Sequence, residues 1–180
     1  MNNRQSSEIA LRPATLAFWT AKSLVFQFIL VASSVALPAA AHLAGAPVRF
    51  LLPMHWPVLL AGLAYGWRGG ALVGLAAPIA SYAVSGYPLP PILPAMTIEL
   101  FVYGLFAGLL RERLHLNGFI SVAVAVVIGR LAFMTAAVMT GGVLLNAEYL
   151  KAALLPGLPA AAVQIALLPV LAGWWVKRAN

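Results

Sequence analysis

The sequence predicts an all-α membrane protein. Of its 180 residues, 63% are hydrophobic and only 8% are charged, which is far from the composition of a water-soluble domain. The apolar residues occur in continuous runs, whereas a membrane β-barrel needs alternating segments of about 10 residues. Because a helix needs about 20 apolar residues to cross the hydrocarbon core, these runs predict transmembrane helices.

Turn signals divide the runs into six predicted helices within a single integral membrane domain, residues 1–180. They cover residues 22–44, 57–65, 69–85, 95–110, 118–143 and 152–176, after an N-terminal segment at 1–20. The second run is too short to cross the membrane straight, and the glycine-rich sequence at 66–70 predicts a tight turn after it. Irregular backbone at membrane depth is tolerated only where protein or a water-filled cavity covers it. We therefore expect the loop before the second run to border a pocket that opens outward.

The distribution of Lys and Arg predicts that both ends of the chain lie in the cytoplasm, because short cytoplasmic loops carry the excess of these residues. One side of the six-helix topology holds Arg4, Arg12, Lys22, Arg68, Arg111, Arg113, Lys177 and Arg178. The other side holds Arg49 and Lys151, while Arg130 lies inside the fifth helix. Topology thus accounts for the net charge of +7, and we expect no nucleic-acid partner. The outward loops are residues 45–56, 86–94 and 144–151.

The middle outward loop contains Pro88, Pro90, Pro91 and Pro94, which disfavour helix and favour a stiff, extended backbone. A loop of this kind suits a lid or a shaped rim, and it equally suits a plain connector.

Small residues at a spacing of four predict close helix packing. Glycines have this spacing at 62, 66, 70 and 74 and again at 104 and 108, where we expect packing within the bundle. Ala17 and Ala21 have the same spacing at the cytoplasmic start of the first helix, where they could present a smooth face to another membrane protein.

Two ionisable side chains are predicted inside the membrane, where their cost makes a functional role the default hypothesis. Glu99 lies near the outer end of the fourth helix and Arg130 near the middle of the fifth. They could form a structural ion pair, or one or both could face a cavity and hold a polar ligand. His42 and His55 fall on the same outer side as Glu99. This convergence predicts an outward binding site.

Three segments carry a resemblance to a known family: LPMHWPVLLAG at 52–62, SGYPLPP at 85–91 and ELFVYGLFAG at 99–108. The region 50–113 resembles the substrate-binding S components of energy-coupling factor (ECF) transporters, the vitamin-uptake branch of the ABC importers. The resemblance implies a six-helix subunit of the prokaryotic cytoplasmic membrane with both ends in the cytoplasm.

The resemblance further implies capture of a vitamin or vitamin precursor at an outward pocket, and delivery with a membrane coupling subunit and two ATPase subunits. It implies that Ala17 and Ala21 contact the coupling subunit. The aromatic residues Trp56, Tyr87 and Tyr103 suit a ligand that contains an organic ring. The candidate substrate-binding residues are His42, His55, Trp56, Ser85, Tyr87, Glu99, Tyr103 and Arg130.

Other functions remain as alternatives. The Met54-His55 pair is similar to the first residues of metal-ion S components, but it is internal here, so the terminal amine is not available as a ligand. Two histidines and one glutamate could still bind a transition metal, which leaves a metal-ion S component as an alternative, but the aromatic residues suit an organic ring better. We therefore expect no resident metal, and we expect no cofactor. A stand-alone secondary carrier would show inverted repeats, which are not evident. An intramembrane enzyme is disfavoured because the chain has no Asp and no H-E-x-x-H motif, and the absence of a P-loop sequence means that energy must come from partners.

Overall fold

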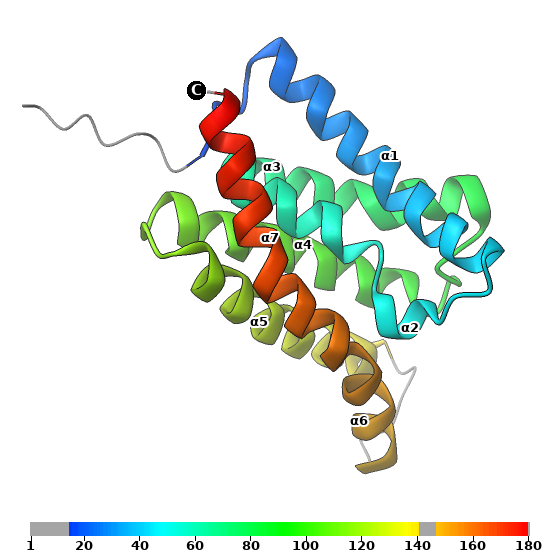
Figure 1. Ribbon diagram of the computed structural model, residues 1–180. Helices are drawn as coiled ribbons and strands as arrows, with labels where there is room; N and C mark the ends of the chain where they lie inside the picture. The colour runs from blue at the N-terminus through cyan, green and yellow to red at the C-terminus, as the bar shows by residue number, and fades with distance from the viewer. Residues whose placement is uncertain (1–14, 141–146, 180) are drawn as a thin grey trace, which may run out of the picture.

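The computed structural model describes residues 15–140 and 147–179, which form a bundle of helices (Figure 1). The elements in chain order are α1 (Ala21–Leu43), α2 (Val48–Leu51), α3 (His55–Ser85), α4 (Leu93–Glu112), α5 (Gly118–Met139), α6 (Ala147–Leu154), the 3-10 helix η1 (Leu155–Gly157) and α7 (Leu158–Ala179). These two ranges contain no β-strand. The all-helical prediction is confirmed.

Five stretches of the described chain are long and apolar enough to cross a membrane: Ala21–Leu43, Val48–Ser85, Leu93–Glu112, Gly118–Met139 and Leu155–Ala179. Large apolar side chains cover their outer surfaces; Phe28 on α1, for example, is 74% exposed. A water-soluble protein does not expose apolar surface on this scale. The bundle is built to contact lipid.

The helix α3 contains two of the predicted helices, and it folds back on itself at Gly66. This residue has φ 72° and ψ −171°, which is not helical. A Cβ atom built on Gly70 would lie 2.8 Å from the Cα atom of Gly62, although a straight helix separates residues eight positions apart by about 12 Å. The two arms of α3 therefore run side by side. The predicted turn is present, but it is confined to Gly66, and the residues after it are helical.

Both arms of α3 pack against α4 through backbone contacts at glycine. A Cβ atom on Gly62 would lie 2.6 Å from the carbonyl oxygen of Gly104, and a Cβ on Gly70 would collide with the same oxygen. One turn further along α4, a Cβ on Gly108 would collide with the backbone of Gly66. The expectation that these glycines pack the bundle internally is confirmed.

The positively charged side chains gather at one end of the molecule. The start of α1, the Gly66 turn, the connection between α4 and α5, and the end of α7 lie at this end, whereas α2, the loop 86–92 and α6 lie at the other (Figure 1). The first end carries Lys22, Arg68, Arg111, Arg113, Lys177 and Arg178. The second carries Arg49 and Lys151, and is called the outer end below. Arg4 and Arg12 lie outside the described residues, and the other cations have the arrangement expected from the sequence.

Prolines change the predicted boundaries near the end of the chain. The prediction of one continuous helix over 152–176 is wrong, because α6 ends at Leu154, η1 follows, and α7 begins at Leu158. Pro156 and Pro159 lie three residues apart and each removes a backbone N–H, which favours a break in the helix between them.

The other boundary differences are smaller. Residues 147–151 of the predicted last outward loop belong to α6, while 144–146 lie outside the described residues, as do 141–143 of the predicted fifth helix. Pro94, predicted in the middle loop, lies in the first turn of α4, where no N–H is needed.

The glycine contact predicts the cost of adding a single methyl group. Gly70→Ala should destabilise the detergent-purified protein by about 1–3 kcal/mol, because the methyl group overlaps the α4 backbone. The control is Gly173→Ala on α7, where an added Cβ atom meets no atom within 4 Å. Thermal unfolding followed by circular dichroism measures both variants. Equal unfolding temperatures for the two would contradict the proposed crossing.

Candidate functional site

The short helix α2 and the turn after it place His55 at the start of α3. Leu52 closes α2 in the left-handed conformation, with φ 45°, and turns the chain toward α3. The indole nitrogen of Trp56 donates a hydrogen bond to the carbonyl oxygen of Leu51 at 3.0 Å, which joins α2 to α3. The predicted start of this helix at Pro57 is two residues late, because Pro57 occupies the third helical position. A backbone N–H in the first turn has no hydrogen-bond partner within the helix, so proline loses no hydrogen bond there.

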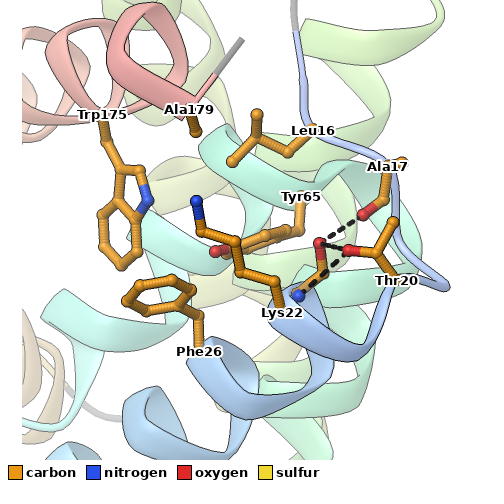
Figure 2. Close-up of a pocket in the computed structure, with 9 residues that line it drawn as sticks. Leu16, Ala17, Thr20, Lys22, Phe26, Tyr65, Trp175 and Ala179 are labelled. Carbon is orange, nitrogen blue, oxygen red and sulfur yellow. Dashed lines mark hydrogen bonds between the residues drawn. The ribbon is translucent and has the colours of Figure 1, made fainter.

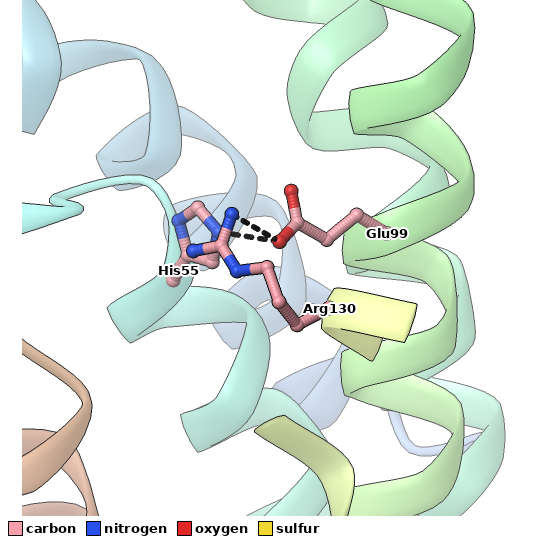
Figure 3. A network of polar contacts seen from close by, with 3 residues as sticks. All are labelled: His55, Glu99 and Arg130. Atoms are coloured by element: carbon pink, nitrogen blue, oxygen red, sulfur yellow. Dashed lines mark ion pairs between the residues drawn. The ribbon is translucent and has the colours of Figure 1, made fainter. Parts of the chain in front are cut away.

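His55, Glu99 and Arg130 form a buried polar cluster that joins α3, α4 and α5 (Figure 3). The Nη1 atom of Arg130 lies 3.1 Å from Oε1 of Glu99, and Nε2 of His55 lies 3.8 Å from the same oxygen. The side chains of Glu99 and His55 are each 2% exposed, whereas that of Arg130 is 17% exposed. The ion pair considered at the sequence level is therefore present, and Arg130 is its more accessible partner.

Tyr103 lies one turn after Glu99 and packs on the histidine. The ring centroids of Tyr103 and His55 are 5.1 Å apart, and Tyr103 is 1% exposed. Gly129 on α5 leaves room for this ring, because a Cβ atom there would collide with Cδ1 of Tyr103. The absence of a side chain at Gly129 thus lets α5 approach α4 closely, which brings the adjacent Arg130 within reach of Glu99.

A cavity of about 230 Å³ adjoins this cluster between α5 and α7. Most of its wall is apolar, with polar groups from Tyr103, Arg130 and Gln164. Gly157 makes room for the guanidinium, since a Cβ atom there would lie 3.0 Å from Nη2 of Arg130. Glu99 and His55 are not among the lining residues. Arg130 therefore contacts Glu99 on one side and the cavity on the other.

Gln164 is a site residue that the sequence analysis missed. It is 1% exposed, it lines the cavity, and its Nε2 atom has no hydrogen-bond partner among the described residues. A signal was present, because Gln164 is the only side chain in 158–173 that can form a hydrogen bond. Burying an unpaired amide costs free energy. This cost could have identified Gln164 from the sequence, just as the cost of a buried charge identified Glu99.

The remaining candidates, His42, Ser85 and Tyr87, form a separate, exposed group at the end of α1, the end of α3 and the loop that follows α3. The ring centroids of His42 and Tyr87 are 6.2 Å apart. The hydroxyl of Ser85 accepts a hydrogen bond from the backbone N–H of Tyr87 at 3.3 Å and donates one to the carbonyl of Ser81 at 2.8 Å. All three candidates are exposed. The single constellation expected from the sequence is thus divided into a buried cluster and an exposed group.

The positions of the two histidines determine whether they could bind one metal ion together. His42 lies in the exposed group, and His55 lies beside Glu99. Within the described ranges, no three His, Asp or Glu side chains are placed to hold one ion.

Ala17 and Ala21 do not share a helical face. Thr20 is the N-cap of α1, so Ala21 is the first helical residue and Ala17 lies in the segment before it. The carbonyl oxygen of Ala17 accepts a hydrogen bond from the Ser23 hydroxyl at 2.6 Å. Ala17 thus lies before the first helix, which agrees with the predicted helix bounds of 22–44, but the two alanines do not form one helical face. Both are exposed at the end of the molecule that carries the cations.

The comparisons with known proteins agree with this architecture. A family model described as "ECF transporter, substrate-specific component" matches residues 22–172 of the 180. No curated protein and no solved structure matches the chain at a significant level. The match covers the second, third and fourth apolar stretches completely and most of the first and fifth, and it includes the buried cluster and the cavity beside it. The chain belongs to the family of ECF-transporter substrate-specific components.

Proposed function

We propose that this protein captures a vitamin or vitamin precursor at the outer end of the bundle, in the prokaryotic cytoplasmic membrane. In this proposal the two arms of α3 count separately, so six helices enter the membrane and both ends of the chain are cytoplasmic. A membrane coupling subunit and two ATPase subunits then complete delivery. Family membership makes the chain a transporter's substrate-binding component and not an enzyme. The grouping of cations at one end supports the proposed orientation.

The position of Arg130 is the observation that carries the proposal. Its guanidinium has five N–H donors in a fixed plane, and Glu99 engages only one side of it. The other side borders the cavity, where the amide nitrogen of Gln164 is a further unpaired donor. Donors from two helices therefore meet at the cavity. They favour a ligand that presents hydrogen-bond acceptors, such as a carboxylate or a carbonyl group.

The rest of the cavity favours a small ligand with an apolar body. Leu131, Met134 and Leu158 contribute apolar walls. The volume of about 230 Å³ is below the roughly 300–1,000 Å³ that is typical of pockets for drug-sized molecules. A compact ring with one polar substituent fits both the size and the lining.

Glu99 and His55 position Arg130 in this proposal. An unpaired guanidinium in a low-dielectric interior is expensive, and the Glu99 carboxylate offsets that cost while holding the group toward the cavity. His55 contacts the same carboxylate oxygen and packs on Tyr103. His42, Ser85 and Tyr87 then serve as an outer entrance on α1 and the loop 86–92, and Trp56 secures the neighbouring α2.

Mass spectrometry of small molecules that co-purify with the detergent-extracted protein should identify the ligand. Arg130→Ala should then weaken its binding by about 10- to 100-fold in calorimetry, because a charge-assisted hydrogen bond contributes about 1.5–3 kcal/mol. His55→Ala should weaken binding less, through a displaced Glu99. Arg113→Ala, at the end that carries the cations, is the control and should bind normally. If Arg130→Ala and His55→Ala both bind the ligand normally, the polar cluster is not part of the ligand-binding site.

The unpaired amide of Gln164 allows a sharper comparison. Gln164→Leu should reduce ligand affinity by about 5- to 10-fold, which is the contribution of roughly one hydrogen bond. The buried Gln27 on α1 is a matched control, because its Oε1 atom also lacks a partner among the described residues and it lies outside the cavity lining. Gln27→Leu should leave affinity unchanged. Similar losses in both variants would indicate a general effect on the fold.

The proposed contact of Ala17 and Ala21 with the coupling subunit predicts a defect in transport alone. Replacing both by Leu should abolish uptake in cells that express the coupling and ATPase subunits, while ligand binding in detergent stays normal. Ala32 and Ala36, which are exposed further along α1, are the control pair, and their replacement by Leu should leave uptake intact. Full uptake by the Ala17/Ala21 variant would contradict the contact, and uptake without any ATPase would instead identify a stand-alone carrier.

A further inference from the structure

Figure 2 shows the residues around a second cavity, of about 190 Å³. The start of α1 and the end of α7, which border it, lie at the opposite end of the molecule from α2 and α6 (Figure 1). The cavity is bounded by the start of α1, by Tyr65 beside the Gly66 turn of α3, and by the end of α7. Of the residues that line this cavity, the substrate-capture proposal uses Ala17 alone, as a contact with the coupling subunit. The residues that line it are Leu16, Ala17, Thr20, Lys22, Ser23, Phe26, Tyr65, Trp175 and Ala179.

Tyr65 supplies an unsatisfied polar group to this cavity. The residue is 2% exposed, and its hydroxyl has no hydrogen-bond partner among the described residues. Leaving a buried hydroxyl unpaired costs free energy, and phenylalanine would fill the same space without that cost. The hydroxyl is thus positioned to donate a hydrogen bond to a molecule that enters the cavity.

The charges around the cavity favour an anion. Figure 2 shows the side-chain amine of Lys22 and the hydroxyl of Tyr65 in the space bounded by Leu16, Phe26 and Trp175. The helix α1 begins here, with Thr20 as its N-cap, so the positive end of its dipole adds to the charge of Lys22. Lys177 and Arg178 in the last turn of α7 increase the positive potential of this end.

The other walls are aromatic and apolar, which a soluble anion does not need. The rings of Phe26 and Trp175 are 5.1 Å apart, and those of Tyr65 and Trp175 are 6.0 Å apart. Next to the cavity, α1 exposes Leu24 and Val25, which are 42% and 59% accessible, on its apolar surface. A phosphate bound at Lys22 would therefore have lipid-facing surface beside it for attached acyl chains.

We propose that this cavity binds the headgroup phosphate of an anionic phospholipid. The Tyr65 hydroxyl and the Lys22 ammonium group donate hydrogen bonds to the phosphate oxygens, while Phe26 and Trp175 pack against the glycerol and the first acyl carbons. Basic pockets between helices at the cytoplasmic membrane surface bind anionic lipids through this chemistry. The bound lipid joins the start of α1 to the end of α7.

Native mass spectrometry of the full chain in a neutral detergent tests the site with phosphatidylglycerol and phosphatidylcholine at equal concentration. The protein should retain phosphatidylglycerol at least fivefold more than phosphatidylcholine. Lys22→Gln should reduce that retention about fivefold, and Tyr65→Phe should reduce it about tenfold. Tyr65→Phe removes one oxygen atom and an unpaired hydroxyl, so this variant should unfold at the same temperature as the parent or higher.

Two matched variants and one competitor complete the experiment. Tyr82→Phe, a partly exposed tyrosine on the same helix, and Lys151→Gln, at the outer end, should retain phosphatidylglycerol like the parent. Equal retention of the two lipids, or full retention by Tyr65→Phe, would overturn the proposal. So would complete displacement of phosphatidylglycerol by an equal concentration of inorganic phosphate, since the cavity would then recognise free phosphate. Loss of lipid retention with normal vitamin binding would separate this site from the substrate site.

Discussion

The close approach of α3 and α4 at glycine is the constraint on which the rest of the structure depends. Lipid provides no hydrophobic force to press helices together, so their association depends on close contact between backbones. Gly62 and Gly70, on the two arms of α3, both meet the backbone of Gly104. A methyl group at Gly70 would push α4 away from α3. It would thereby separate His55 on α3 from Glu99 on α4.

Close approach of two helices at a glycine also brings the polar cluster together at α5. Gly129 lets α5 approach Tyr103, and the next residue, Arg130, then reaches Glu99 at 3.1 Å. Neither charge could remain alone in this interior without a large desolvation cost, so the pair joins α4 to α5. Gly157 leaves space for the guanidinium on the α7 side. Two positions without side chains, Gly129 and Gly157, thus determine where the Arg130 side chain can lie.

The two cavities lie at opposite ends of the molecule and differ in their lining. The outer one adjoins a charge-paired cluster and has an apolar lining, which suits a small ligand that is captured and released. The other is lined by Lys22 and by aromatic side chains, at the end where the start of α1 and the end of α7 meet. Ala17 lines this second cavity. An anionic lipid bound there would lie next to the proposed contact with the coupling subunit.

Local patterns in the sequence determined much of the architecture. The bounds of α1 and α4 agree with the prediction within two residues, because continuous apolar runs identify membrane helices without any knowledge of their neighbours. The glycine spacing correctly indicated internal packing. The cost of placing an ionisable group in hydrocarbon identified Glu99 and Arg130, and that cost depends on the residue type alone.

Only the tertiary structure decided which side chains meet. His42 and His55 fall on the same side of the predicted topology, yet His42 lies beside Tyr87 and His55 beside Glu99. Gln164 entered the site because α7 packs against α5 and turns that residue toward the cavity. Helical periodicity specifies the residues that share one face of a helix. The packing of whole helices specifies which faces come together, and this depends on contacts between residues that are far apart in the chain.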